Sequence, residues 1–259
     1  MPTVRDIEAA LYDWAPRSLA ESWDNVGLLV GSGGAEVRRV LVALDVTEWV
    51  ADEALQIGAD LIVAHHPVMN CRWHEVQHVT DGDAQGRILT KLLRSGVSAI
   101  CMHTNLDAAE GGVNDILARL LGLEGAEPFN EEKIGRVGAL KCEKSLEQFL
   151  QDVVKSLGCR GLRYRDGGRS VHRVAVGGGA CAEFVPLVLA LGCDTFVTSD
   201  VKYHDFLDAH GLNLIDAGHF ETENPVCAAV RAYLAERFPR LELVSSTSHA
   251  ESVIQYYMK

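Results

Sequence analysis

The feature that most constrains the fold of this chain is an internal correspondence between two segments 134 positions apart. Residues 39–66 align without a gap on residues 173–200. Arg-Val-x-Val opens both segments, and Gly-x-Asp falls at the same place near the end of each. Both read as strand, turn, helix, glycine stop and second strand. The correspondence favours two similarly built α/β halves, although any two strand–helix–strand units share part of this pattern.

The same alternation extends along the rest of the chain. Apolar runs typical of buried strands lie at 40–44, 61–64, 97–102, 136–141, 171–176, 195–198 and 212–215. Helical patterns lie between them and at both ends, at 1–16, 47–57, 88–93, 113–121, 145–157, 184–191 and 225–238. Such alternation predicts an α/β fold with mixed sheets covered by helices. We expect two similar domains, 1–128 and 129–259, related by a pseudo-two-fold axis.

Composition narrows the class of protein. The net charge of −12 and the lack of a Lys/Arg cluster argue against phosphate-backbone binding as the main task. The apolar stretches reach only about ten residues, which is too short to cross a bilayer. Seven cysteines without a Cys-x-x-Cys pair are typical of a reducing compartment. The composition therefore predicts a cytoplasmic protein with a full hydrophobic core.

His65-His66-Pro67 directly follows the predicted strand 61–64. Successive side chains of a strand point to opposite faces, so two adjacent histidines can serve one site only where the chain leaves the sheet. Pro67 favours such an exit because it keeps the preceding residue out of the helical region. This geometry suits two neighbouring metal ions with one imidazole each. A lone His-His-Pro is equally compatible with a structural role.

Two further segments favour the metal interpretation. His103 and Asp107 follow the predicted strand 97–102 and add an imidazole and a carboxylate at another strand end. His219 and Glu223 follow the strand 212–215, four residues apart, so on a helix they share one face with Cβ atoms about 5–6 Å apart. Glu221 would point elsewhere, and an acidic helix start is the alternative explanation for both glutamates. Imidazole with carboxylate oxygen suits zinc, manganese or iron, and an aspartate can bridge two ions.

At these residues the chain resembles the dinuclear-metal-centre family, the NIF-three-like proteins often labelled GTP cyclohydrolase I type 2 homologues. The matching motifs occur in the same order from Ile7 to Tyr256. They are Trp23-Asp24-Asn25-x-Gly27-Leu28, Asp45-Val46-Thr47, His65-His66-Pro67, His103-Thr104-Asn105-Leu106-Asp107, Thr198-Ser199-Asp200-Val201-Lys202-Tyr203-His204 and Gly218-His219-x-Glu221-Thr222-Glu223.

The resemblance implies two similar α/β domains with a two-metal site in the cleft between them, without the third domain that some members insert. It also implies a ring-shaped homohexamer. The metal ligands that it implies are His65, His66, Asp107, His219 and Glu223, with Glu223 bridging. The two divalent ions would be zinc, manganese, iron, cobalt or nickel.

A bridged pair of ions predicts a metal-dependent hydrolase of a small, nucleotide-like substrate, with no membrane partner and no nucleic acid. The competing interpretation is a non-catalytic metal-binding scaffold or partner-binding assembly. Nucleic-acid processing is a third, which basic residues such as Arg160, Arg163 and Arg165 lining a ring would assist.

The candidate catalytic residues are His103, Asp200, Lys202 and His204. His103 would orient a water or act as general base, unless it only packs behind the ligands. Lys202 would contact a substrate phosphate and His204 would transfer a proton. The alternative for Asp200, Lys202 and His204 is that they form an ordinary polar helix start after Thr198. Five other histidines and two cysteines are expected to be solvated, structural or part of the packing: Cys71, His74, His78, Cys101, His172, His210 and His249. His249 is also a candidate to reach the cleft.

Overall fold

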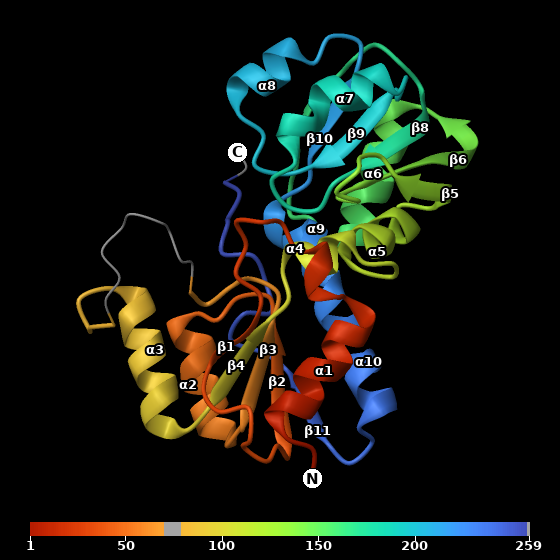
Figure 1. Ribbon diagram of the computed structural model, residues 1–259. Helices are drawn as coiled ribbons and strands as arrows, with labels where there is room; N and C mark the ends of the chain where they lie inside the picture. The colour runs from red at the N-terminus through yellow and green to blue at the C-terminus, as the bar shows by residue number, and fades with distance from the viewer. Residues whose placement is uncertain (70–78, 258–259) are drawn as a thin grey trace. The chain divides into compact units, whose positions relative to one another are not determined.

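The computed structural model describes residues 1–69 and 79–257 (Figure 1). The predictions for Cys71, His74 and His78 lie outside these residues. The chain forms two compact units. Unit 1 comprises Met1–Ala109 and Val226–Glu251, and unit 2 comprises Glu110–Pro225 and Ser252–Lys259. The division into domains 1–128 and 129–259 stays a prediction.

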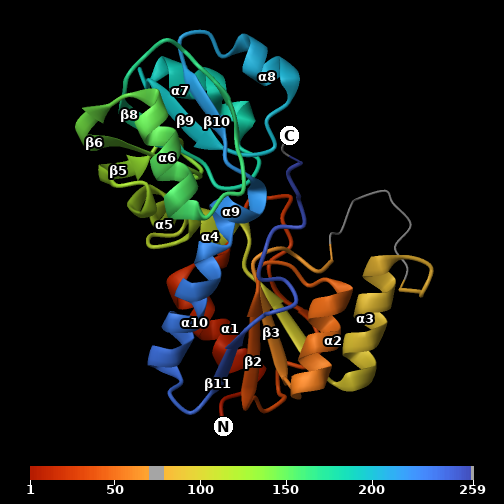
Figure 2. The same ribbon diagram turned by 180° about the vertical axis from the view of Figure 1, so that it is seen from behind.

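Unit 1 contains a five-stranded sheet in the order β1-β4-β3-β2-β11. The strands are β1 (Gly27–Val30), β2 (Arg39–Ala43), β3 (Leu61–Ala64), β4 (Ser98–Cys101) and β11 (Glu242–Ser245). All neighbours pair in parallel except β1, which is antiparallel to β4. Figures 1 and 2 show α1 (Val4–Trp14) and α10 (Pro225–Arg237) on one face, and α2 (Glu48–Ile57) and α3 (Ala84–Ser95) on the other. Two short helices, η1 (Arg17–Leu19) and α4 (Thr104–Ala108), complete unit 1.

The alternation of side chains along the strands explains why helices cover both faces. Leu41 and Ala43 of β2 belong to the core formed with α2 and α3, while the intervening Val40 and Val42 are also buried. A strand that is apolar on both sides needs a cover on both sides. The helix α1 begins as expected with a capping box, in which Thr3 and Asp6 satisfy each other's backbone N–H groups.

Unit 2 contains a six-stranded sheet in the order β5-β6-β8-β9-β10-β7. Its strands are β5 (Leu123–Pro128), β6 (Arg136–Lys144), β7 (Arg163–Arg165), β8 (Val171–Val176), β9 (Thr195–Thr198) and β10 (Asn213–Asp216). Only β8, β9 and β10 pair in parallel, so this sheet is also mixed, as predicted.

Helices cover both faces of the second sheet. One core contains α5 (Val113–Leu120) and α6 (Leu146–Leu157), and the other contains α7 (Val185–Ala190) and α8 (Tyr203–Asp208). The short helix η2 (Ala182–Phe184) precedes α7, and the short helix α9 (His219–Glu223) follows β10. Within residues 1–69 and 79–257, every helix is too short or too polar to span a membrane.

The predicted correspondence between residues 39–66 and 173–200 extends to hydrogen bonds. One carboxylate oxygen of Asp60 accepts the backbone N–H groups of residues 38–39, at 2.7 and 3.0 Å. One carboxylate oxygen of Asp194 accepts those of residues 172–173, at 3.0 and 2.7 Å. In both copies the aspartate therefore joins the start of its own strand to the start of the neighbouring parallel strand. Equivalent sequence positions perform the same structural task in the two units.

These two aspartates give a test of the correspondence. Asp194→Ala and Asp60→Ala each leave two backbone N–H groups without their acceptor, so each should lower the free energy of unfolding by about 1–3 kcal/mol. Urea denaturation followed by circular dichroism measures the loss. The exposed Asp208→Ala serves as control and should change stability by less than about 0.5 kcal/mol. Losses at residues 60 and 194 no larger than the control's would contradict the shared role.

Candidate metal centre

The carboxyl ends of the parallel strands in unit 1 carry the predicted metal ligands of that unit. His65 and His66 follow β3, and His103 follows β4. Asp45 follows β2, the next strand of the sheet. Neighbouring parallel strands end at the same edge of a sheet, which is where α/β proteins form their sites. The sheet therefore brings these side chains together, although they come from separate parts of the chain.

Three imidazoles converge at this edge. His65, His66 and His103 each offer a ring nitrogen, and the three nitrogen atoms lie within 4.8 Å of one another. A fourth potential donor is close by, because Nε2 of His65 lies 3.6 Å from a carboxylate oxygen of Asp107. The side chain of His65 is almost fully buried, and Asp107 is 8% exposed. The structure thus adds His103 to the candidate ligands predicted for this half of the chain.

Carboxylates fix the orientation of two of these rings. Nδ1 of His66 lies 2.7 Å from Asp45, and Nδ1 of His103 lies 2.9 Å from Asp24. An ionised carboxylate can only accept a hydrogen bond, so Nδ1 carries the proton in both rings. The lone pair is then on Nε2. This tautomer, with a carboxylate on the far nitrogen, is typical of histidines that bind metal ions.

His65 is held in the same way by the backbone. Its Nδ1 lies 2.7 Å from the carbonyl oxygen of Met102, the last residue before His103. A carbonyl oxygen also only accepts, so the Nε2 lone pair is again the one available to a ligand. That nitrogen is the atom directed toward Asp107.

The two orienting carboxylates are kept ionised by their surroundings. Burial alone would raise the pKa of Asp24, but hydrogen bonds from His103 and Thr104 outweigh it and hold the pKa well below its usual value. Burial likewise opposes ionisation of Asp45, and hydrogen bonds from two histidines, His249 and His66, reverse its effect on the pKa. Both groups therefore act as acceptors throughout the neutral pH range.

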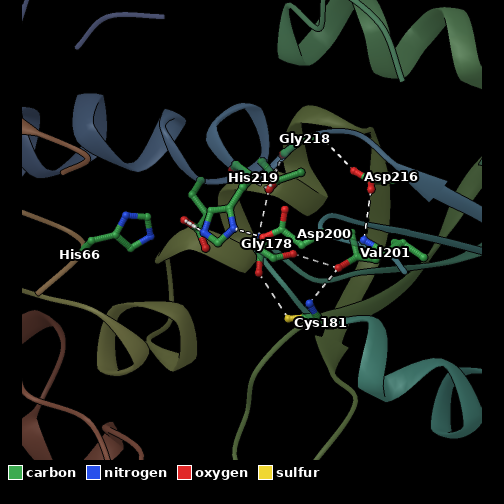
Figure 3. Close-up of polar contacts among 12 residues, drawn as sticks. His66, Gly178, Cys181, Asp200, Val201, Asp216, Gly218 and His219 are labelled. Atoms are coloured by element: carbon green, nitrogen blue, oxygen red, sulfur yellow. Dashed lines mark hydrogen bonds and ion pairs between the residues drawn. The ribbon is translucent and has the colours of Figure 1, made fainter. Parts of the chain in front are cut away.

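Unit 2 contains one histidine that a carboxylate orients in the same way (Figure 3). His219 lies at the start of α9, with Nδ1 2.7 Å from Asp200 and Nε2 3.0 Å from Glu223. Helix α9 places His219 and Glu223 on one face, as predicted from their spacing. Glu223 is 4% exposed. Asp200 accepts the hydrogen bond from Nδ1 of His219, and its predicted catalytic role remains untested.

The turn that carries Asp200 is itself anchored. Asp200 has φ of 52°, a left-handed conformation that is uncommon outside glycine. The buried Asp216 at the end of β10 accepts hydrogen bonds from the backbone N–H groups of Val201 and Gly218 (Figure 3). Asp216 also pairs with Arg163. One carboxylate thus ties the turn after β9 to the segment that leads into His219.

The donor set fits a divalent metal ion. With the proton on Nδ1, His219 directs a lone pair at a carboxylate oxygen only 3.0 Å away. His65 and Asp107 show the same opposition at 3.6 Å. Two lone pairs facing each other repel unless a cation lies between them or the imidazole takes a second proton and donates a hydrogen bond. Nitrogen and oxygen donors in this combination suit zinc and similar divalent metals.

Other predicted residues have different positions. Lys202 and His204 are exposed at the start of α8, and their predicted catalytic roles remain untested. Arg163 and Arg165 make hydrogen bonds within unit 2, to Val201 and to carbonyls of α8. Burial raises the pKa of Cys101 to about 12, in agreement with its predicted packing role.

Sequence reasoning did not identify Asp24 or Asp45 as the groups that orient histidines. Both lie in motifs that were recognised, Trp23-Asp24-Asn25 and Asp45-Val46-Thr47, but no chemical role was assigned to either residue. For Asp45 a signal was available, because it follows a parallel strand at the same edge as His65-His66. Asp24 lies in a turn before β1, and its contact with His103 spans 79 residues, which no local pattern predicts.

The fold and these donors together define a two-sheet α/β protein with a group of side chains that could hold a metal ion. Comparison with known proteins agrees: the model of the Duf34/NIF3 (NGG1p interacting factor 3) family matches residues 2–251, and the chain belongs to this family. A Clostridium perfringens protein named GTP cyclohydrolase 1 type 2 homolog is 34% identical over 243 residues, covering 90% of this chain and 92% of that one. A Streptomyces coelicolor protein of the same name is 34% identical over 250 residues, covering 91% and 87%. The crystal structure of a Bacillus cereus protein related to NIF3 superposes with a TM-score of 0.90 at 25% identity, covering 99% of both chains.

A glycine beside Glu223 allows a test of the donors in unit 2. A Cβ atom at Gly179 would lie 2.1 Å from a carboxylate oxygen of Glu223 and 3.2 Å from Nε2 of His219. Gly179→Ala should therefore displace the glutamate and weaken metal binding at least tenfold, as measured by titration with Zn²⁺. Gly168→Ala is the matched control, since Gly168 has a similar φ of 73° but open space around its Cβ position. Equal affinities in the two variants would contradict the placement of Glu223 among the ligands.

Proposed function

We propose that this protein holds two divalent metal ions through His65, His66, Asp107, His219 and Glu223, with Glu223 bridging, and that it is a metal-dependent hydrolase. The observation that carries the proposal is the shared orientation of the imidazoles. His65, His66, His103 and His219 each direct Nδ1 at an oxygen atom, which puts the proton of the neutral ring on Nδ1 and the lone pair on Nε2. Ordinary surface histidines have no reason to share this arrangement.

The count of donors supports a site that draws on both units. Unit 2 offers one imidazole and one buried carboxylate, which are too few for a stable protein site. Unit 1 offers three imidazoles and a carboxylate. Five or six protein donors shared by two ions leave coordination positions open for water and substrate, which catalysis requires and a purely structural site does not.

Divalent ions in such a site would acidify a water molecule and neutralise negative charge on the substrate. The residues of the chain would supply the rest. Asp24, Asp45 and Asp200 keep their histidines in one tautomer and orientation, and a ligand held in place needs no reorganisation when substrate binds. Lys202, exposed on unit 2, is the candidate to meet a substrate phosphate, and His204 the candidate to carry a proton.

The substrate class that we propose is a small nucleotide-like molecule. The relatives' name, GTP cyclohydrolase 1 type 2 homolog, supports GTP as the first compound to test. The net charge of −12 supports a small ligand drawn in by metal ions over a nucleic acid bound through its backbone. We further propose a cytoplasmic, ring-shaped homohexamer, which light scattering after size-exclusion chromatography would test by mass.

Removal of the metal should abolish hydrolysis. Protein stripped with a chelator should lose activity against GTP and a panel of nucleotides and phosphoesters, and should regain it on addition of Mn²⁺ or Zn²⁺. Release of phosphate and the change in purine absorbance measure the two reaction types. If fully metal-loaded protein hydrolyses none of these compounds, the enzyme proposal is wrong and the non-catalytic scaffold is the better account.

Metal content per chain tests the site independently of activity. We expect about two ions per wild-type chain and a clear loss in His66→Ala and in Glu223→Ala, because each variant removes a ligand. His172→Ala, which removes an exposed imidazole on β8, should keep the wild-type content. Elemental analysis of dialysed protein gives the stoichiometry. Unchanged content in both ligand variants would refute the proposed site.

A further inference from the structure

His249 forms a hydrogen bond at the metal-binding edge of unit 1 from a distant part of the chain. Its Nε2 lies 2.8 Å from the second carboxylate oxygen of Asp45, whose first oxygen holds Nδ1 of His66 at 2.7 Å. The three side chains form a continuous line from His249 through Asp45 to His66. His249 and Asp45 are 204 residues apart in the sequence. The imidazole of His249 is buried, with 7% of its side chain exposed.

The sheet explains how His249 reaches this position. Strand β11 pairs in parallel with β2, and Ser245 is in register with Val42. Asp45 follows β2 and residues 246–249 follow β11, so both segments leave the same edge side by side. The backbone N–H of Ser246 continues the ladder with a hydrogen bond to Val42.

A glutamate of α2 fastens the segment that carries His249. Glu53 accepts hydrogen bonds from the hydroxyl groups of Ser246, Thr247 and Ser248, at 2.6–2.8 Å. It also accepts the backbone N–H groups of Thr247 and Ser248. Burial opposes ionisation of Glu53, but these hydrogen bonds outweigh it and lower the pKa to about 2. The ionised glutamate therefore holds residues 246–248 firmly near neutral pH.

We propose that His249 is a positioning residue of the metal centre, which fixes the plane of the Asp45 carboxylate and through it the orientation of His66. This inference rests on the proposed function, because it assigns His66 as a ligand. A carboxylate held at one oxygen can rotate about its Cβ–Cγ bond, whereas one held at both oxygens cannot. The Ser-Thr-Ser-His segment and Glu53 together form the support for that second contact.

His249 itself is not assigned as a ligand. Its Nε2 faces the Asp45 carboxylate at 2.8 Å, so in the neutral ring Nε2 carries the proton, and His249 belongs to none of the groups of potential ligand atoms that residues 1–69 and 79–257 form. The other three histidines of this edge have the opposite tautomer, with the proton on Nδ1. His249 is therefore distinguished from the ligands by the nitrogen that it uses.

Titration of metal-free protein with Co²⁺ tests the proposal, because the visible d–d spectrum reports coordination geometry as well as affinity. His249→Ala should weaken binding about tenfold, the low end of the effect of losing a partner of a ligand, and should shift the d–d bands. His249→Gln places an amide N–H near the position of Nε2 and should restore most of the affinity and the wild-type spectrum. Glu53→Gln should act in the same direction as His249→Ala, by a smaller factor. His172→Ala is the control for loss of a histidine outside the site.

The outcomes separate this proposal from the proposed function. If wild-type protein gives no Co²⁺ spectrum, the metal site itself is wrong. If wild type binds Co²⁺ and His249→Ala gives the same affinity and bands, the positioning role is wrong while the metal site stands. A weaker affinity in both His249→Ala and His249→Gln with unshifted bands would also overturn the role, since it would indicate only general loosening. Thermal denaturation of each variant confirms that the compared proteins are folded.

Discussion

The candidate site depends on the hydrogen bonds that Nδ1 of each histidine donates to an oxygen atom. Imidazole binds a metal through a lone pair, and which nitrogen has that lone pair is decided by the partner of the other nitrogen. Asp24, Asp45, Asp200 and the carbonyl of Met102 make this choice for four histidines, always in favour of Nε2. Three of these partners are carboxylates that burial would otherwise tend to neutralise or that lie in a strained turn. Buried ionised carboxylates and a strained turn are thus found where the protein orients an imidazole.

The two units reach this result from one structural plan. Asp60 and Asp194 perform the same backbone contacts, and Gly58 and Gly192 end the helix of each copy with φ near 70°. The plans diverge at the following strand end, where His65-His66 in unit 1 corresponds to Ser199-Asp200 in unit 2. The first copy places two proposed ligands there, and the second copy places Asp200, which orients the proposed ligand His219. A shared scaffold with different residues at its carboxyl edge thus provides both parts of a donor set.

Every central strand of the two sheets was predicted from the sequence, and all four edge strands were missed. β1, β11, β5 and β7 are the edge strands of the two sheets. A central strand is apolar on both faces and reads as a continuous hydrophobic run, whereas β5, β7 and β11 are largely exposed and lack that signal. The positions of the candidate ligands next to central strands were therefore predictable, together with the His219–Glu223 spacing. The contacts of Asp24 with His103 and of His249 with Asp45 were not predicted, because Asp24 lies in a turn and His249 follows an edge strand.

The pairing of β11 with the first sheet is connected to the orientation of the Asp45 carboxylate in the candidate site. The chain builds β1 to β4, passes through unit 2, and only then returns with α10 and β11 to finish the first sheet. The segment after β11 carries His249, so the contact with Asp45 comes from the part of this edge that lies last in the sequence. Loop closure over so long a separation is entropically unfavourable, and the hydrogen bonds from residues 246–248 to Glu53 offset it locally. Under the proposed positioning role of His249, the affinity of His66 for metal depends on whether β11 has joined the sheet.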